Sequence, residues 1–144
     1  MLKKLNNIGD SGVVCDFGDD VNRTINEEVI KLFHYFQKQI SLGKMEGILN
    51  CIPSYNKLII NFDLKKINSK KIFQIINSID FLKLDLNQDQ KKWTIPICYD
   101  FEMDLTNMSK VLKIDKSEII KIHSETTFFI YMVGFVPGHP FMGD

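Results

Sequence analysis

The chain has 144 residues, and its 18 Lys and Arg side chains balance 18 Asp and Glu, so its formal net charge is zero. A neutral chain has no long-range attraction for DNA, RNA or an anionic membrane surface, which excludes proteins that bind nucleic acid through a strongly basic face. With 44% hydrophobic and 25% charged residues, the composition is that of a folded protein and not of a disordered one.

The sequence contains few features that indicate a cellular compartment. The cysteines Cys15, Cys51 and Cys98 form no close pair, which fits a reducing compartment better than a disulfide framework. The basic N-terminal residues precede no signal-type apolar stretch, and no apolar run approaches the roughly 18 residues of a membrane span. We therefore expect a cytoplasmic protein that does not associate with a membrane.

The first 88 residues carry the signals of a small α+β domain. Apolar, β-favouring runs alternate with segments of helical spacing. The predicted strands are 11–17, 48–52, 57–62 and 80–86, and the predicted helices run from Ile25 to Gly43 and from Asn68 to Ile79. The order strand, helix, strand, strand, helix, strand is the split βαβ pattern, so we predict a ferredoxin-like domain over residues 1–88.

Local signals mark the ends of these elements. Asp19, Asp20 and Asn22 offer an N-cap for the first helix, and Asn68 offers one for the second. The run Pro53-Ser54-Tyr55-Asn56 between two strands has the composition of a hairpin loop.

A wholly polar segment, 87–92, is the predicted linker to a second domain over residues 89–144. After it, a strand is expected from Trp93 to Tyr99. Pro96 cannot donate to a strand ladder, so this strand is restricted to an edge or a bulge.

Two helical segments follow this strand. Residues 105–112 have helical apolar spacing. Asp115 and Glu118 then have the spacing of a capping box, and Ile114 and Ile119 stand at the positions of a hydrophobic staple. A second helix is therefore predicted to start at Asp115.

The last part of the chain combines a strand, Thr127–Val136, with a Gly/Pro-rich loop, 134–144. Apolar residues alternate onto both faces of the strand, which predicts burial on both sides. A second half of about fifty residues is marginal as a separate domain. We expect it to be the beginning of a larger domain whose remainder a partner supplies, or else the chain to be a fragment.

Candidate chemistry is limited to a few histidines. His34, His123 and His139 lack metal-ligand spacing and the cysteines fall in apolar strands, so no metal site is predicted. There is no phosphate loop of the GxxxxGK[ST] or GxGxxG type. His123 near a helix end suits either helix capping or a functional role, and His139 lies in a loop of the kind that carries binding residues.

Several segments together resemble one protein family. They are Gly9-Asp10-Ser11, Phe17-Gly18-Asp19 with Asn26 and Val29, Pro53-Ser54-Tyr55, Ile95-Pro96-Ile97-Cys98-Tyr99-Asp100, Leu105, the helix from Ser117 to His123, Tyr131, and Gly134-Phe135-Val136-Pro137-Gly138-His139-Pro140-Phe141. The chain resembles, along its whole length, the family of the 5-oxoprolinase B subunit. This family is also described as allophanate hydrolase subunit 1 or carboxyltransferase subdomain C/D, and it includes a sporulation kinase inhibitor.

The resemblance implies a ferredoxin-like N-terminal domain and a cyclophilin-like β-barrel that begins near the strand at Ile95. It also implies a complex with subunits C and A that opens 5-oxoproline to L-glutamate with ATP hydrolysis. The ring amide is a poor electrophile, and phosphorylation of its carbonyl oxygen makes it open to attack by water. ATP, with Mg²⁺ as its candidate companion, would bind in the complex without a recognisable motif in this chain.

The sequence departs from the family pattern in two ways. His139 and Phe141 stand where the family usually has an aromatic residue and a tyrosine, and the family's barrel runs on beyond residue 144. We therefore expect a truncated or split copy, with an incomplete barrel over residues 89–144, that is inactive alone. The alternatives are a carboxyltransferase-type subunit acting on urea or allophanate, and a binding protein that inhibits a histidine kinase.

The family loop and its neighbours give candidates for a ligand pocket or a subunit contact, but no catalytic assignment. They are His123, Tyr131, Gly134, Phe135, Pro137, Gly138, His139 and Pro140.

Overall fold

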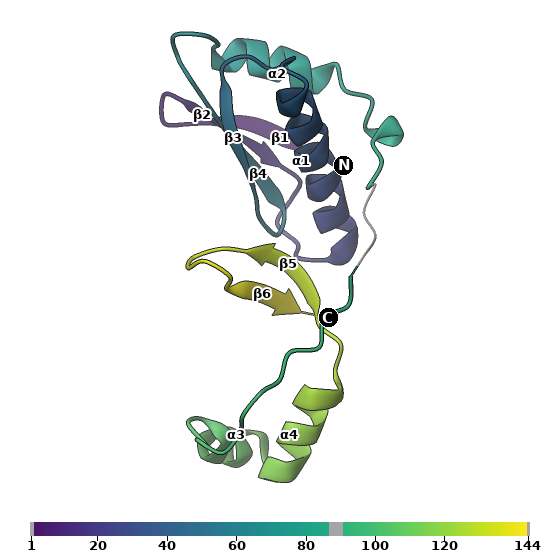
Figure 1. Ribbon diagram of the computed structural model, residues 1–144, viewed down its shortest axis with the longest axis vertical. Coiled ribbons are helices and arrows are strands. Elements are labelled where there is room, and N and C mark those ends of the chain that lie inside the picture. Colours follow the sequence, from purple (N-terminus) through teal and green to yellow (C-terminus); the bar gives the residue numbers. More distant parts are fainter. Residues whose placement is uncertain (1, 87–90, 144) are drawn as a thin grey trace. The chain divides into compact units, whose positions relative to one another are not determined.

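The computed structural model describes residues 2–86 and 91–143 (Figure 1). By its internal contacts the chain divides into two compact units, Met1–Gln88 with Phe129–Gly143, and Asp89–Phe128. Four residues of the predicted linker, 87–90, lie outside the described residues. The predicted division into domains 1–88 and 89–144 stays a prediction.

An antiparallel sheet of four strands organises the first unit (Figure 1). In spatial order the strands are β1 (Lys4–Ile8), β2 (Gly12–Asp16), β4 (Lys57–Phe62) and β3 (Ile48–Pro53). The helix α1 (Arg23–Ser41) connects β2 to β3 with β4 between them, which makes one split βαβ unit. The helix α2 (Ser69–Asn77) follows β4, and a 3-10 turn, η1 (Phe81–Lys83), follows α2.

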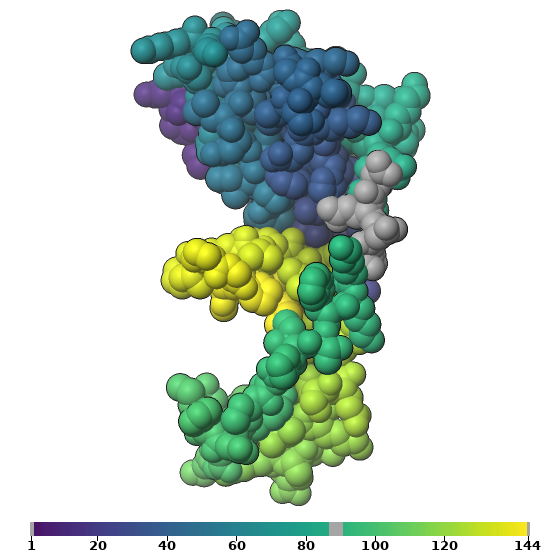
Figure 2. Space-filling view, in the orientation of Figure 1, coloured from purple at the N-terminus to yellow at the C-terminus, as the bar shows by residue number. Residues whose placement is uncertain are grey.

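Alternation along the strands and helical spacing along α1 build the core of this unit. Every second residue of β4 from Leu58 to Phe62 is buried. The side chains of Val29, Leu32 and Phe36 on α1 have no exposed surface. Burial of each such side chain contributes roughly 1.5–3 kcal/mol, which holds the helix against the sheet. Figure 2 shows the outer atoms of the sheet, α1 and α2, purple to teal, gathered into one closely packed body that covers this core.

Both predicted helices of the first unit are present, and their caps explain where they start. The side chain of Asn22 accepts a hydrogen bond from the Ile25 N–H at 2.9 Å, and the side chain of Asn68 accepts one from the Lys71 N–H at 3.0 Å. Each bond satisfies a donor that the first turn of a helix leaves unpaired. The hairpin loop predicted at residues 53–56 connects β3 to β4.

The predicted strand at 80–86 is wrong. The side chain of Asp80 accepts a hydrogen bond from the Leu82 N–H at 3.1 Å and turns the chain into η1, in which Leu82 is 97% exposed. The sheet position beside β2 is taken by β1, a strand that apolar patterning did not predict because it has few apolar residues. Gly9, at a φ of 57°, makes the turn between β1 and β2.

The second unit contains α3 (Leu105–Leu112) and α4 (Lys116–Glu125), as their apolar spacing predicts. The Glu118 N–H donates to the Asp115 carbonyl at 3.1 Å, so α4 begins where expected. The Asp115 side chain makes no capping bond, and the predicted capping box is therefore not formed.

The strand predicted from Trp93 to Tyr99 is also wrong, because no strand occurs between residues 91 and 99. The alternating side chains of Trp93, Ile95 and Ile97 are 73%, 59% and 51% exposed. An alternating pattern becomes a strand only when a neighbour accepts its backbone hydrogen bonds, and Pro96 has no N–H to offer.

A two-stranded antiparallel sheet closes the described chain, formed by β5 (Phe129–Val133) and β6 (Pro140–Gly143). We call it the hairpin. Its first strand is shorter than predicted, and its second lies where a loop is predicted. Burial on both faces is wrong for the described structure, since Tyr131 is 3% exposed but Ile130 and Val133 are 41% and 60% exposed.

The predicted mixture of helices and antiparallel sheets is confirmed. The finer ferredoxin-like and cyclophilin-like descriptions stay predictions, since the structure shows one split βαβ unit and one two-stranded sheet. Among the helices in the described ranges, none combines the length and apolar character needed to cross a membrane.

Candidate functional site

The predicted site residues from Gly134 to His139 come together in the turn of the hairpin, and Pro140 begins β6. Three backbone bonds hold this turn. The Gly134 N–H donates to the His139 carbonyl at 3.0 Å, the Val136 N–H to the Gly134 carbonyl at 2.8 Å, and the His139 N–H to the Val136 carbonyl at 3.1 Å. These hydrogen bonds therefore hold the backbone of the turn in one defined conformation.

Backbone strain is concentrated at the tip of this turn. Phe135 has a φ of 65° although it carries a side chain, and that side chain is 93% exposed. A left-handed conformation of a non-glycine residue costs on the order of 1–3 kcal/mol. Such strain is concentrated at binding and catalytic sites in proteins, and here it projects an aromatic ring away from the protein surface.

Tyr131 is the predicted site residue that lies deepest. It stands on β5 and is 3% exposed, with its ring 5.4 Å from the ring of Tyr55 and 4.8 Å from that of Phe129. A Cβ atom added at Gly143 on β6 would lie 3.1 Å from the Tyr131 ring. This glycine therefore lets the ring pack flat against the backbone of the hairpin.

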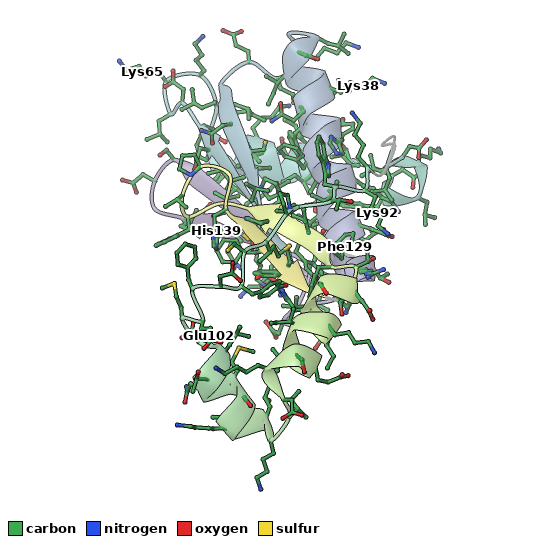
Figure 3. The ribbon with its side chains drawn as sticks, turned by 60° about the horizontal axis from the view of Figure 1, so that its bottom comes forward. Lys38, Lys65, Lys92, Glu102, Phe129 and His139 are labelled. Atoms are coloured by element: carbon green, nitrogen blue, oxygen red, sulfur yellow. The ribbon has the colours of Figure 1, made fainter. Side chains whose placement is uncertain are left out.

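Tyr131 belongs to a larger set of touching rings, which we call the ring cluster. Its members are Tyr55, Phe129, Tyr131, His139 and Phe141. Phe141 links the loop to the rest, because its ring centroid is 6.2 Å from that of Tyr55 and 5.0 Å from that of His139. Phe129 and His139 lie toward opposite ends of the hairpin, at the start of β5 and in the turn (Figure 3). The cluster therefore joins the predicted loop to the β3–β4 loop of the large sheet.

Asn26 ties the same elements together through hydrogen bonds. Its side chain is 1% exposed, and its Nδ2 atom donates to the carbonyls of Ser54 and Tyr55, both at 3.1 Å, and to that of Tyr131 at 3.2 Å. One amide of α1 thus satisfies acceptors on both the β3–β4 loop and β5. At the level of sequence, Asn26 contributed only to the family resemblance. An amide three residues before Val29, on the buried face of a helix, is the signal that could have identified it.

A charged pair supports the neighbouring β2–α1 loop. The Lys57 ammonium donates to the Asp16 carboxylate at 2.6 Å and to the Gly18 carbonyl, and the Gly18 N–H donates to the same carboxylate at 2.8 Å. The hydrogen bond from Lys57, and after it the one from Gly18, hold the pKa of Asp16 below its usual range. The carboxylate therefore stabilises the loop in its charged form.

Replacing Asp16 with Asn is expected to lower the free energy of unfolding at neutral pH by about 1 kcal/mol. The folded-state pKa is lowered, so the stabilisation is fully present above the unfolded pKa of about 3.9 and is lost as pH falls through the folded pKa. Urea unfolding of both proteins across this range should show a difference that narrows as pH falls. Asp10→Asn, in the exposed β1–β2 turn, is the control, and a D16N difference that stays constant down to low pH would contradict the prediction.

His123 lies in the second unit, in the last turn of α4. Its Nδ1 atom and the hydroxyl oxygen of Tyr99 are 2.7 Å apart, and its ring contacts that of Phe128 at 5.5 Å. The phenol and the imidazole form an exposed hydrogen-bonded pair. His123 is thus held by its own unit and is not part of the ring cluster.

One family model matches nearly the whole chain. Residues 3–144 match the model of the carboxyltransferase domain, subdomain C and D. The chain belongs to this family. The matched range includes the hairpin turn, Asn26 and the ring cluster, so these features lie within the family's domain.

Two curated relatives, each named as the B subunit of 5-oxoprolinase, are similar to this family member. The one from Haemophilus influenzae (strain ATCC 51907 / DSM 11121 / KW20 / Rd) is 37% identical over 138 residues and covers 94% of this chain. The one from Bacillus subtilis (strain 168) is 26% identical over 153 residues and covers 97% of this chain. The chain spans 62% of the length of each relative, and their names describe a subunit of a larger enzyme.

A solved structure gives an independent comparison of the fold. The crystal structure of TTHA0988 matches with a TM-score of 0.74 and 20% identity, covering 91% of this chain and 25% of that one. At this identity the likeness shows the fold alone.

The cysteines of this family member divide into two kinds. Burial raises the pKa of Cys15 to about 12, with a smaller effect from Cys51, and burial raises the pKa of Cys51 to about 12. Both are core residues, as predicted, and are poor nucleophiles because the thiolate is disfavoured. Cys98 is exposed and lies outside any strand, so its predicted place in an apolar strand is wrong.

The groups of the site are suited to binding a ligand or a partner. Within residues 2–86 and 91–143, no group of three or more His, Cys, Asp or Glu side chains is placed to hold a metal ion. The ring cluster provides aromatic faces, the Tyr131 strand is fixed by Asn26, and His139 provides an exposed imidazole. These groups can bind and orient a small ligand or a partner surface.

Proposed function

We propose that this chain is the B subunit of an ATP-dependent 5-oxoprolinase complex, which opens 5-oxoproline to L-glutamate. The proposal rests on one observation above the others, the 37% identity over 94% of the chain to a curated 5-oxoprolinase B subunit. The family match over residues 3–144 supports it. The proposed partners are subunits C and A, and the chain alone is expected to be inactive.

The hairpin turn does not offer its Gly134, Val136 and His139 amides to an ATP phosphate. The Gly-rich hairpin turn is the natural place for phosphate-binding amides, but the N–H groups of Gly134, Val136 and His139 already donate to carbonyls inside the turn. Among the described side chains no cluster of carboxylates is placed to hold Mg²⁺. We therefore assign ATP and Mg²⁺ to the partner subunits, and we assign to this chain the binding of substrate or of those partners.

The outer face of the hairpin supports a role in assembly. Ile130 and Met142 are paired across the two strands, and with Val133 they are 41%, 44% and 60% exposed. A two-stranded sheet with an exposed apolar face is marginal in water. We propose that polypeptide corresponding to the remaining part of the longer relatives covers this face in the complex, supplied by a separate chain if this is a split copy.

Reconstitution tests the proposed activity. The chain is co-expressed with subunits C and A, the assembly is purified through a tag on this chain, and glutamate formation from 5-oxoproline and ATP is measured. We expect co-purification, and we expect glutamate only when this chain, the partners and ATP are all present. A complex that forms equal glutamate without this chain would contradict the proposal.

Two substitutions separate the hairpin face from general surface effects. Ile130→Asp places a charge on the exposed hairpin face, while Leu82→Asp places one on η1, where the side chain is 97% exposed. In a co-expression that also includes polypeptide corresponding to the remaining part of the longer relatives, Ile130→Asp is expected to abolish co-purification of that polypeptide and Leu82→Asp to leave it unchanged. Equal co-purification of both variants would show that the hairpin face is not the contact.

A carboxyltransferase is the second candidate, favoured by the family's description as a carboxyltransferase domain. Such a subunit would transfer a carboxyl group from carboxybiotin to a small amide such as urea. The two candidates are distinguished by the requirement for a biotinylated carrier. Activity that depends on a carrier and bicarbonate, and not on 5-oxoproline, would favour the carboxyltransferase.

A further inference from the structure

Arg23 is the first residue of α1, and its guanidinium lies over the ring of Phe129 in the hairpin. The Cζ atom is 5.2 Å from the ring centroid, which is a cation–π contact across 106 positions of sequence. Arg23 is exposed, and none of the ion pairs of the described residues includes it. Its charge is therefore uncompensated where it stands.

The position of Arg23 is not explained by helix stability. A cation in the first turn of a helix opposes the helix dipole and costs roughly 0.3–1 kcal/mol, and the first turn of α1 contains no acidic residue to offset it. Arg23 is also the single arginine in a chain in which lysine supplies the other basic residues. A lysine would supply the same charge, so the guanidinium itself is the distinguishing feature of this position.

The contact with Phe129 leaves the N–H donors of the guanidinium without an ion-pair partner among the described residues. A guanidinium carries five N–H donors in a planar fork, and the face of one ring engages its charge without using up these donors. A carboxylate can accept two parallel hydrogen bonds from such a fork. Phe129 is itself fixed by an edge-to-face contact with the buried Tyr131 ring at 4.8 Å, so the guanidinium rests on a rigid support.

We infer that Arg23, placed over the ring of Phe129, is the recognition site for the carboxylate of a small flat-ring acid, with the ring cluster as the neighbouring aromatic surface. The class of ligand follows from the chemistry of the groups, a fixed guanidinium beside aromatic rings. Naming 5-oxoproline as the member of this class, a lactam ring that carries one carboxylate, rests on the proposed function.

Three variants test the site. Arg23→Gln removes the charge, and Arg23→Lys keeps the charge but loses the planar fork. Lys38→Gln removes one charge from the other end of the same helix (Figure 3) and is the matched control. In the reconstituted complex, Arg23→Gln is expected to raise KM for 5-oxoproline at least tenfold, about the effect of one lost charged hydrogen-bonded pair, with a smaller change in kcat. Arg23→Lys should give an intermediate KM, and Lys38→Gln the wild-type value.

A binding measurement on the full chain makes the test independent of the activity. Saturation-transfer NMR is recorded with 5-oxoproline and with 2-pyrrolidinone, which has the same lactam ring without the carboxylate. The wild-type chain is expected to bind 5-oxoproline more tightly than 2-pyrrolidinone, and Arg23→Gln to remove that difference. Thermal unfolding of each variant shows whether the fold is kept.

The outcomes separate this inference from the proposed function. If the complex is active, KM decides, and an equal KM for wild type and Arg23→Gln overturns the inference while the proposed function stands. If the complex is inactive, the proposed function fails and the binding measurement decides. Binding of 5-oxoproline that depends on Arg23 then supports the site, whereas no binding, or equal binding by Arg23→Gln, overturns it.

Discussion

Replacing Asn26 with Asp is expected to destabilise the first unit by roughly 3–5 kcal/mol, more than any surface change in this chain. The Nδ2 atom that donates to the Ser54, Tyr55 and Tyr131 carbonyls becomes an oxygen that cannot donate. A carboxylate at 1% exposure would then face three acceptors with no partner for its charge. Urea unfolding of the purified chain measures the loss.

Asn7→Asp is the matched control for this change. It makes the same substitution on the exposed part of β1 and is expected to alter stability by less than about 0.5 kcal/mol. Asn26→Asp should recover part of its stability as pH falls, because protonation returns a neutral donor to the site. An Asn26→Asp protein as stable as the wild type at neutral pH would show that the three hydrogen bonds do not hold the elements together.

Much of the first unit could be predicted from local signals. Both helices, three of the sheet strands and the two asparagine caps follow from apolar spacing and from the preference of Asn for helix starts. The two exceptions, β1 and the segment 80–86, depend on which strands pair in the sheet. β1 has little apolar patterning and is a strand because β2 bonds to it, from Lys4 against Asp16 to Ile8 against Gly12. With that place filled, the segment after Ile79 cannot pair with β2.

The second half shows the same limit more clearly. Apolar alternation from Trp93 to Ile97 is a strand pattern, but a pattern specifies only which residues would face a core. Backbone partners are needed as well, and the described chain does not provide them there. The helices α3 and α4 form as predicted because a helix satisfies its hydrogen bonds within its own segment.

The candidate site was predictable as far as one continuous loop. Gly and Pro at positions 134, 137, 138 and 140 indicate a turn, and the structure places the first three in the turn and Pro140 at the start of β6. The partners of that turn were not predictable. The contacts of Tyr131 with Tyr55 and Asn26, and of Phe129 with Arg23, join residues 76 to 106 positions apart, because the hairpin packs against α1 and the β3–β4 loop.

Replacing Tyr131 with Ala is expected to release the hairpin from the rest of the first unit, the four-stranded sheet with α1 and α2, with a loss of roughly 3–5 kcal/mol in the local free energy of opening. The change removes a ring at 3% exposure that packs on Tyr55, Phe129 and the backbone of Gly143. Hydrogen exchange followed residue by residue should show β5 and β6 amides losing protection, while the amides of β2 and β4 keep theirs.

The prediction for Tyr131→Ala depends on this difference in protection between the two sheets. The four-stranded sheet is expected to stay protected because it has its own core of Leu58, Ile60 and residues of α1. Tyr131→Phe retains the ring and is expected to keep most of the protection of the hairpin. Val133→Ala, on the same strand at 60% exposure, should change protection by less than about 0.5 kcal/mol. Loss of protection in β2 and β4 equal to that in β5 would instead make the hairpin part of one cooperative core. In that case the ring cluster would stabilise the whole unit, and the hairpin would open only together with the four-stranded sheet.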